Sequence, residues 1–168
     1  SAPHASAISS SVSRSEPAQR RVLTILGDLA LVLGSLVLYV RTLAPTVLAA
    51  DSGEFQLVSS VLGIAHPPGY PLYTLLGKLF TLLPIGNVAW RVNLLSAVIS
   101  AATLWVLSRC VRLVTGSSLA GWLGAAYLGV ASTFWAQATT ANIRSLTVLL
   151  VATQILQLLA YERTGKQG

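Results

Sequence analysis

The chain has 168 residues, of which 54% are hydrophobic and 10% are charged, and its mean hydropathy is +0.70. Soluble domains rarely combine so much apolar surface with so little charge, so this composition predicts an integral membrane protein in a lipid bilayer. The net charge of +6 would suggest a nucleic-acid partner in a soluble protein, but here the basic residues lie at the ends of apolar segments, as membrane topology produces, and no nucleic-acid partner is expected.

The N-terminal segment differs in composition from the rest of the chain. Residues 1–19 are rich in Ser, Ala and Pro and have no apolar periodicity, so we predict a disordered tail. The apolar stretch that follows is longer than the hydrophobic region of a signal peptide, and we expect it to be a retained anchor. Residues 20–168 would then form a single transmembrane module.

Four segments approach the length of about 20 residues that a helix needs to cross the hydrocarbon core of a membrane. They are residues 22–40, 90–113, 118–139 and 143–161. The sequence therefore predicts an all-α polytopic membrane protein with about four transmembrane helices. Asp28 falls inside the first segment, about two turns from its end, and is expected to form a hydrogen bond to another helix.

A long insert, residues 41–89, separates the first two predicted spans. It is predicted to contain two short interfacial helices. The first, within DSGEFQLVSSVLG, would be capped by Ser52, with Asp51 next to its positive N-terminus. The second would begin near Pro71, since a proline in the first turn of a helix lacks only an N–H group that the helix does not need. A fifth crossing by this second helix is the alternative.

The distribution of Lys and Arg indicates how the spans are oriented. If the insert returns to the side it left, one face of the membrane receives seven basic residues and the other receives four. The seven are Arg14, Arg20, Arg21, Arg109, Arg112, Arg163 and Lys166, and the four are Arg41, Lys78, Arg91 and Arg144. Because the cytoplasmic side carries the excess, we predict cytoplasmic N- and C-termini and an external or periplasmic loop 41–89.

Two acids of the insert, Asp51 and Glu54, are candidates for catalysis. Because they are three residues apart, their carboxylates would point to one side of a helix. Such a pair can bind a divalent cation, with Asp51 as a ligand, or act as a general base with a supporting acid. The structural alternative is that Asp51 caps a helix and Glu54 is a solvated surface residue.

Further polar residues of the insert are candidates for substrate binding. His66 and Tyr70 flank a proline-rich turn whose rigid backbone could direct both side chains toward a ligand, although a purely structural turn is the alternative. Lys78 and Arg91 are cations on the face that the positive-inside rule depletes, and a lipid phosphate would suit them. Ordinary headgroup contacts, or pairing with the two acids, would explain these cations nearly as well.

The run from Leu38 to Val98 closely resembles the N-terminal part of a membrane-protein family long catalogued as a domain of unknown function. The motifs TLAPTV, DSGEF, HPPGYPLY and WRVNLLSA occur in the order and spacing of the family, and a looser similarity continues through FWAQAT. The animal member of this family is a protein O-mannosyltransferase, and the family looks like the GT-C class of glycosyltransferases.

This resemblance implies a function for the insert. It would be the first external loop of a glycosyltransferase, with two juxtamembrane helices beside the active site. Asp51 would be the general base for the acceptor hydroxyl or would help to bind a metal, and Glu54 would stand close by. The donor would be a sugar on a polyprenyl phosphate, with Lys78 and Arg91 as candidate contacts of the phosphate.

Two departures from the family pattern leave a second hypothesis open. In the family, FWAQA is usually followed by an acid and a tyrosine, as in AEVY, whereas this chain has Asn142, Ile143 and Arg144, and an asparagine cannot act as a carboxylate. Family enzymes also have many more spans. We therefore expect either the N-terminal module of a transferase, completed by further sequence or a partner, or a non-catalytic accessory subunit that joins other membrane subunits in a larger complex.

Overall fold

The computed structural model describes the backbone of residues 4–165 and the side chains of residues 18–165. The described part of the chain consists of helices and the turns between them. The helices are α1 (His4–Arg41), α2 (Ala50–Val61), α3 (Pro71–Thr81), α4 (Val88–Thr115), α5 (Ser118–Val130), α6 (Ser132–Ala138) and α7 (Ile143–Gly165). The predicted all-α fold is confirmed.

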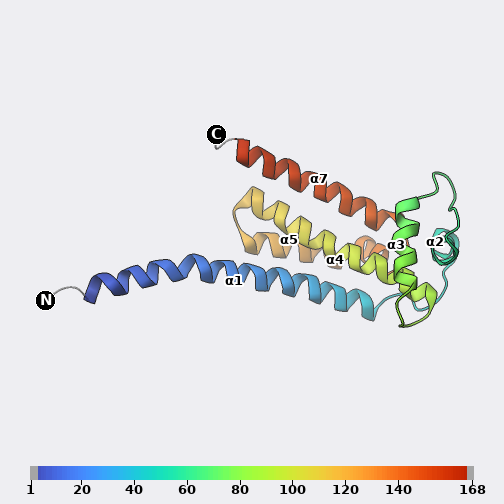
Figure 1. Ribbon diagram of the computed structural model, residues 1–168, viewed down its shortest axis with the longest axis horizontal. Coiled ribbons are helices and arrows are strands. Elements are labelled where there is room, and N and C mark those ends of the chain that lie inside the picture. The colour runs from blue at the N-terminus through green and yellow to red at the C-terminus, as the bar shows by residue number, and fades with distance from the viewer. Residues whose placement is uncertain (1–3, 166–168) are drawn as a thin grey trace.

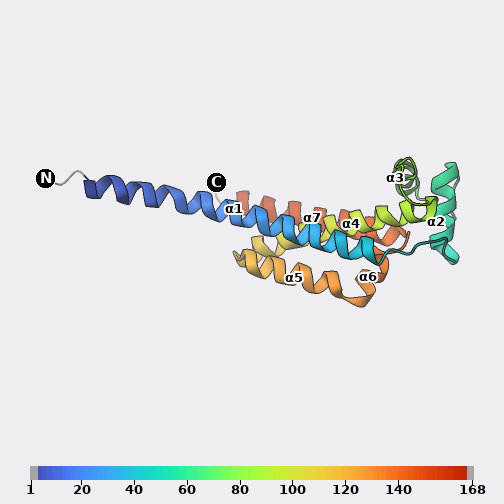
Figure 2. The ribbon, with the colours of Figure 1, turned by 90° about the horizontal axis from the view of Figure 1, so that it is seen from below.

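The helices form an elongated bundle with two helices lying across one of its ends. In Figures 1 and 2, α1, α4, α5 and α7 follow the long axis, whereas α2 and α3 cross the end at which α1 stops and α4 starts. The start of α1 and the end of α7 lie toward the opposite end. The insert therefore leaves and returns at the same end of the bundle. Its second helix, α3, has 11 residues and is too short to form a fifth crossing.

Helix α1 includes most of the segment for which the composition predicts a disordered tail. It begins at His4 and continues without interruption into the first predicted span. Extending an existing helix is much easier than nucleating a new one, which allows Ser- and Ala-rich residues to join it. Residues 1–3, and the side chains of residues 1–17, lie outside the described part of the chain.

Three helices are long and apolar enough to cross a membrane: α1 from Ala18, α4 and α7. A fourth span results only if α5 and α6 are counted together, because the chain bends by 75° between them. The predicted continuous helix over 118–139 is therefore wrong. Ala131 has an extended backbone (φ −65°, ψ 131°) that ends α5, and the Tyr39 hydroxyl donates a hydrogen bond to the Gly129 carbonyl at the bend (2.8 Å).

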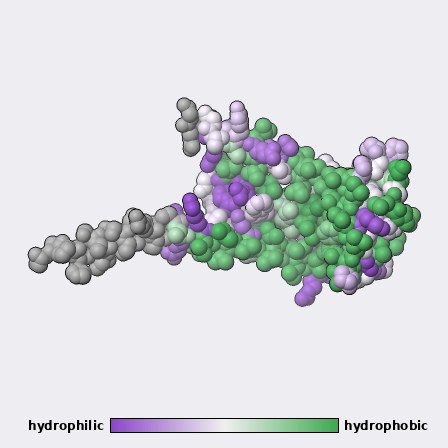
Figure 3. Space-filling view, in the orientation of Figure 1, coloured by the Kyte–Doolittle hydropathy of each residue, from purple (hydrophilic) through white to green (hydrophobic). Residues whose placement is uncertain are grey.

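The surface of the bundle agrees with a membrane environment. Large apolar side chains such as Leu26, Leu33, Leu123 and Leu158 are exposed along α1, α5 and α7. Figure 3 shows a broad green, apolar surface along the bundle on the face in view, with polar side chains mainly toward its two ends. The described part is thus an integral membrane module with three to four candidate spans.

The predicted start is correct for one helix of the insert and wrong for the other. Helix α3 begins at Pro71, as predicted. Helix α2 begins at Ala50, and its N-cap residue, Ala49, makes no side-chain hydrogen bond to the helix. The predicted cap at Ser52 is therefore wrong, because Ser52 already lies within the first turn. Asp51 also lies in that turn, where a carboxylate is favoured by the helix dipole.

Asp28 forms the predicted hydrogen bonds between helices. Its carboxylate accepts bonds from Nη1 and Nη2 of Arg112 on α4 (3.3 and 3.0 Å) and from Nε1 of Trp122 on α5 (2.8 Å). The carboxylate thus joins three helices at the end of the bundle away from the insert. The side chains of Asp28 and Arg112 are 14% and 20% exposed, so the ion pair is mostly shielded.

Replacing Asp28 by leucine is expected to destabilise the bundle by about 2–3 kcal/mol, less than the range for fully buried pairs, because Arg112 keeps its charge without a partner. The thermal unfolding of the detergent-solubilised protein measures this loss. The double variant Asp28→Leu/Arg112→Leu should recover part of the stability, since it leaves no unpaired charge. A single variant as stable as the wild type would show that the pair is solvated rather than structural.

Candidate functional site

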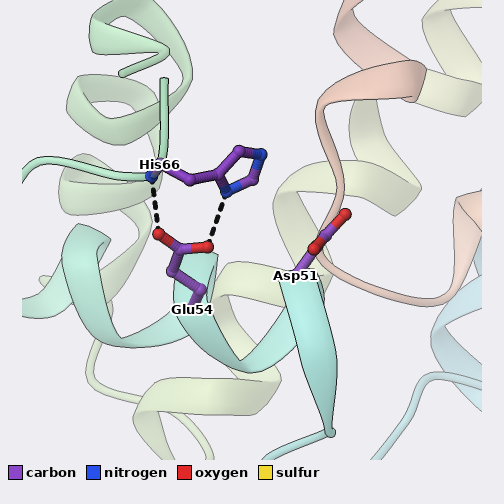
Figure 4. Close-up of side chains that lie close together, drawn as sticks. All are labelled: Asp51, Glu54 and His66. Carbon is purple, nitrogen blue, oxygen red and sulfur yellow. Dashed lines mark hydrogen bonds and ion pairs between the residues drawn. The ribbon is translucent and has the colours of Figure 1, made fainter. Parts of the chain in front are cut away.

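The candidate site lies on α2 and on the turn that follows it. Asp51 and Glu54 are one turn apart in α2, and one oxygen of each carboxylate and one ring nitrogen of His66 all lie within 4.8 Å of one another. Figure 4 shows Glu54 and His66 facing each other, with Asp51 beside them at the start of α2. The structure therefore brings together the two predicted catalytic acids and one predicted substrate-binding residue.

Glu54 and His66 form a two-point interaction. The backbone N–H of His66 donates to Oε1 of Glu54 (2.6 Å), and Nδ1 of His66 lies 2.6 Å from Oε2. The hydrogen bond from the His66 side chain is the main reason that the pKa of Glu54 is lowered, and the same bond raises the pKa of His66. The contact therefore favours the carboxylate form of Glu54 and the imidazolium form of His66.

The ring of Phe55, on α2, packs against His66 and against two tyrosines that follow it in the chain. Phe55 is 1% exposed, and its ring centroid lies 5.9 Å from His66, 5.5 Å from Tyr70 and 5.0 Å from Tyr73. The buried ring thus joins α2, the proline-rich turn and the first turn of α3. Tyr70, a predicted substrate-binding residue, is partly buried in this cluster next to His66 (5.4 Å).

Asp51 keeps its carboxylate available. It is exposed, and it accepts no hydrogen bond and forms no ion pair among the described side chains. A carboxylate in this state can accept a proton from a hydroxyl group. The bond between Nδ1 of His66 and Glu54 leaves Nε2 as the ring nitrogen open to a further ligand, so the same three residues can act as an ion pair beside a free carboxylate or as ligands of a divalent cation.

Gly53, in the motif DSGEF, fixes how α2 starts. A Cβ atom at this position would lie 2.1 Å from the carbonyl oxygen of Leu48, a backbone atom that cannot rotate away. Gly53→Ala is therefore expected to destabilise the protein by about 1–3 kcal/mol and to shift Asp51. The midpoint of thermal unfolding measures the effect. Gly34→Ala is the matched control, because a Cβ there meets nothing within 4 Å, and equal stability of the two variants would contradict the expected clash.

A buried network of amide hydrogen bonds connects α2 to α4 and to two neighbouring segments. Gln56 Nε2 donates to Oδ1 of Asn93 on α4 (2.9 Å), which also accepts from the N–H of Ala141 (2.8 Å). Nδ2 of Asn93 donates to the carbonyl of Ala44 (2.8 Å). Asn93 thus connects α2 to the loop before it and to the segment between α6 and α7. Asn93 is not among the residues predicted from the sequence, although an amide inside an apolar predicted span is a signal for such a role.

Asn142 has a structural role next to this network. Its Oδ1 accepts from the N–H of Ser145 in the first turn of α7 (2.9 Å), while its Nδ2 donates to the carbonyls of Gln137 (2.6 Å) and Thr140 (2.7 Å). Its backbone N–H donates to the Tyr73 hydroxyl (3.0 Å). Burial raises the pKa of Tyr73 to about 12, so this hydroxyl stays neutral.

The structure does not bring the predicted phosphate contacts to Asp51. Nζ of Lys78 donates to the carbonyl of Ser60 near the end of α2 (2.6 Å), about 14 Å along the helix from Asp51 at 1.5 Å per residue. Arg91 donates to a carbonyl at the end of α3 and to that of Gly86 (3.1 Å). In this structure both cations donate hydrogen bonds to backbone carbonyls of the insert, in and next to α2 and α3.

The ion pair of Glu54 and His66 predicts a pH dependence for the loop. Its stabilising contribution is fully present above the ordinary pKa of Glu54, 4.5, and below that of His66, 6.5. It is lost when the pH falls through the lowered pKa of Glu54 or rises through the raised pKa of His66. An NMR titration of His66, assigned with His66→Gln, should give a pKa above 6.5. Glu54→Gln should return that pKa toward 6.5, and an unshifted wild-type value would contradict the pair.

These features define a class: a polytopic helical membrane protein that presents an acidic residue and a carboxylate–histidine pair at one end of its bundle. The family described as "Protein O-mannosyl-transferase TMEM260 N-terminal domain" matches residues 51–167 of the chain. The chain belongs to this family, and the resemblance drawn from its motifs is confirmed. The matched region includes DSGEF and the whole candidate site.

Two relatives show the extent of the similarity. The chain is 37% identical over 126 residues to protein O-mannosyl-transferase TMEM260 of Mus musculus, a match that covers 74% of this chain and 18% of the relative. It is 30% identical over 119 residues to the Dictyostelium discoideum protein of the same name, covering 69% of this chain and 14% of the relative. The chain thus spans less than a fifth of the length of either relative. No solved structure matches it.

Proposed function

We propose that this chain is the N-terminal membrane module of a glycosyltransferase that uses a sugar linked to a polyprenyl phosphate, and that Asp51 is its general base. The observation that carries this proposal is the carboxylate of Asp51, which is exposed and has no partner among the described side chains, beside the Glu54–His66 pair. A hydroxyl acceptor must lose a proton as the new glycosidic bond forms, and a free carboxylate can take it. The relatives, which are named protein O-mannosyl-transferases, support the same chemistry.

Within this proposal, the pair holds the loop while Asp51 acts. Glu54 is already bonded twice to His66 and is therefore better suited to position the turn than to accept a proton. His66 and Tyr70 would then border the acceptor site. Lys78 and Arg91 would reach a donor phosphate only by exchanging their present carbonyl partners. The excess of basic residues that the sequence assigns to the other face of the membrane supports placing the insert on the external side.

The second candidate function is that of a non-catalytic subunit, and Asn142 favours it. The amide group of Asn142 donates two hydrogen bonds, which a carboxylate cannot do. The segment between α6 and α7 is thus suited to an amide in place of the acid that the family usually has there. Arg144, exposed on the first turn of α7, adds a positive charge nearby.

A transfer assay on the complete polypeptide, purified with any subunits that stay attached, distinguishes the two functions. Incubation with a polyprenyl-phosphate mannose and a hydroxyl-bearing polypeptide should release polyprenyl phosphate and yield mannosylated product. Native mass spectrometry of the same sample gives its composition. No transfer, together with co-purification in fixed ratio with a larger unrelated assembly, would contradict the transferase proposal and support the accessory subunit.

A further inference from the structure

A groove between α1 and α4 lies at the end of the bundle away from the insert. It encloses about 460 Å³ and is lined mainly by apolar side chains, with Asp28 and Arg109 at its polar end. The apolar lining residues are Ile25, Leu29, Val32, Ala102 and Trp105. Ile25 and Leu29 are 58% and 49% exposed, so the groove opens along the side of two candidate membrane spans, where an acyl chain can enter.

A second hollow continues this groove toward the polar end of the bundle. It has a volume of about 420 Å³ and shares Ile25, Asp28 and Arg109 with the apolar groove. Its lining includes four guanidinium groups, those of Arg20, Arg21, Arg109 and Arg112. The carboxylate of Asp28 is the sole acid in this lining, and it is already bonded to Arg112 and Trp122. The hollow therefore carries a strong positive charge.

Trp105 and Arg109 mark the boundary between the apolar and basic parts. The guanidinium carbon of Arg109 lies 5.1 Å from the centroid of the Trp105 ring, at a distance typical of cation–π contacts. This contact places the charge of Arg109 next to the apolar part of the groove. Among the described side chains, no carboxylate forms an ion pair with Arg109.

We propose that this groove binds one anionic glycerophospholipid, with an acyl chain along α1 and α4 and its phosphate against Arg109 and the neighbouring arginines. A phosphate accepts several charge-assisted hydrogen bonds from arginine, and basic pockets between transmembrane helices suit anionic headgroups. The two parts of the site occur in the order in which a lipid presents its chain and its headgroup. The site lies at the other end of the bundle from Asp51 and is independent of the proposed transferase function.

The test is lipid binding by the complete, delipidated protein in neutral detergent, followed by native mass spectrometry. Phosphatidylglycerol and phosphatidylcholine with the same acyl chains are the two probes. We expect one phosphatidylglycerol to be retained in preference to phosphatidylcholine. Arg109→Gln should weaken its binding about fivefold, and Arg20→Gln/Arg21→Gln/Arg109→Gln about 100-fold. Arg144→Gln, which removes an exposed arginine at the other end of the bundle, is the matched control and should change nothing.

A second measurement locates the acyl chain. Phosphatidylglycerol brominated on its chains should quench the fluorescence of Trp105, and the quenching should fall in Trp105→Phe. Equal binding of phosphatidylcholine, or an unchanged affinity in the triple variant, would overturn the proposal. An absence of both lipid retention and quenching would also overturn it, since another part of the polypeptide or a partner then fills the groove. Competition by inorganic phosphate without any quenching would show a headgroup site only, and would likewise contradict it.

Discussion

The Asp51→Asn variant is expected to transfer sugar about 10²–10⁴-fold more slowly than the wild type, which is the usual contribution of a positioned general base. Asparagine has nearly the same shape as aspartate, but it cannot accept the proton of the acceptor hydroxyl. The rate is measured as the initial rate of release of polyprenyl phosphate by the complete polypeptide. Because the lost step is chemical, the rate at saturating donor and acceptor should fall, with little change in the concentrations needed for saturation.

The controls separate chemistry from folding. Asp51 is exposed and has no hydrogen-bond partner among the described residues, so Asp51→Asn should unfold at the same temperature as the wild type. Glu54→Gln should lower the rate less, because it weakens the bond that holds His66 but leaves the base in place. A full rate in Asp51→Asn would remove this residue from the reaction. A full rate in that variant with a large loss in Glu54→Gln would assign the base to Glu54.

The Asn93→Leu variant is expected to lose about 3–5 kcal/mol of stability, because each buried polar group left without a partner costs about 1–3 kcal/mol. Leucine has a similar size but leaves three groups unsatisfied: the Gln56 amide, the Ala141 N–H and the Ala44 carbonyl. These groups belong to three different segments beneath the candidate site. Thermal unfolding in detergent measures the loss, and protease cleavage of the insert should increase in parallel.

Asn87 offers a matched comparison six residues earlier. It is an exposed N-cap of α4 whose side chain accepts from the N–H of Trp90 (2.8 Å) and donates to the carbonyl of Pro45 (2.8 Å). Asn87→Ala is expected to cost about 0.5–2 kcal/mol, as for other N-caps. A smaller loss in Asn93→Leu than in Asn87→Ala would contradict the central role of the buried network.

The role of Asn142 changes how the departure from the family pattern is understood. The sequence suggests only the loss of an acid, whereas the structure shows an amide that caps α7 and holds the preceding turn through two donated bonds. Because a carboxylate lacks donors, an acid at this position would need a different turn. The turn of this chain therefore fits an amide at position 142.

Features set by local sequence could be predicted. Stretches of about 20 apolar residues predict the spans because the hydrocarbon core has a fixed thickness, and Pro71 predicts the start of α3 because its ring fixes the backbone angle of a first turn. The one-turn separation of Asp51 and Glu54 predicts that they share a side of α2. The motifs DSGEF and HPPGYP then identified the family, which the match over residues 51–167 confirms.

Features set by contacts between distant residues were decided by the tertiary structure. His66 contacts Glu54, which lies 12 positions earlier in the chain, because Phe55 is buried between α2 and α3. The periodicity of the sequence does not predict this contact. The bend of 75° after α5 coincides with a hydrogen bond from Tyr39 to Gly129, which lies 90 positions away. Apolar periodicity reports which residues avoid water, but hydrogen bonds and ring contacts between distant segments arise only once the helices have packed, and these contacts give the candidate site its shape.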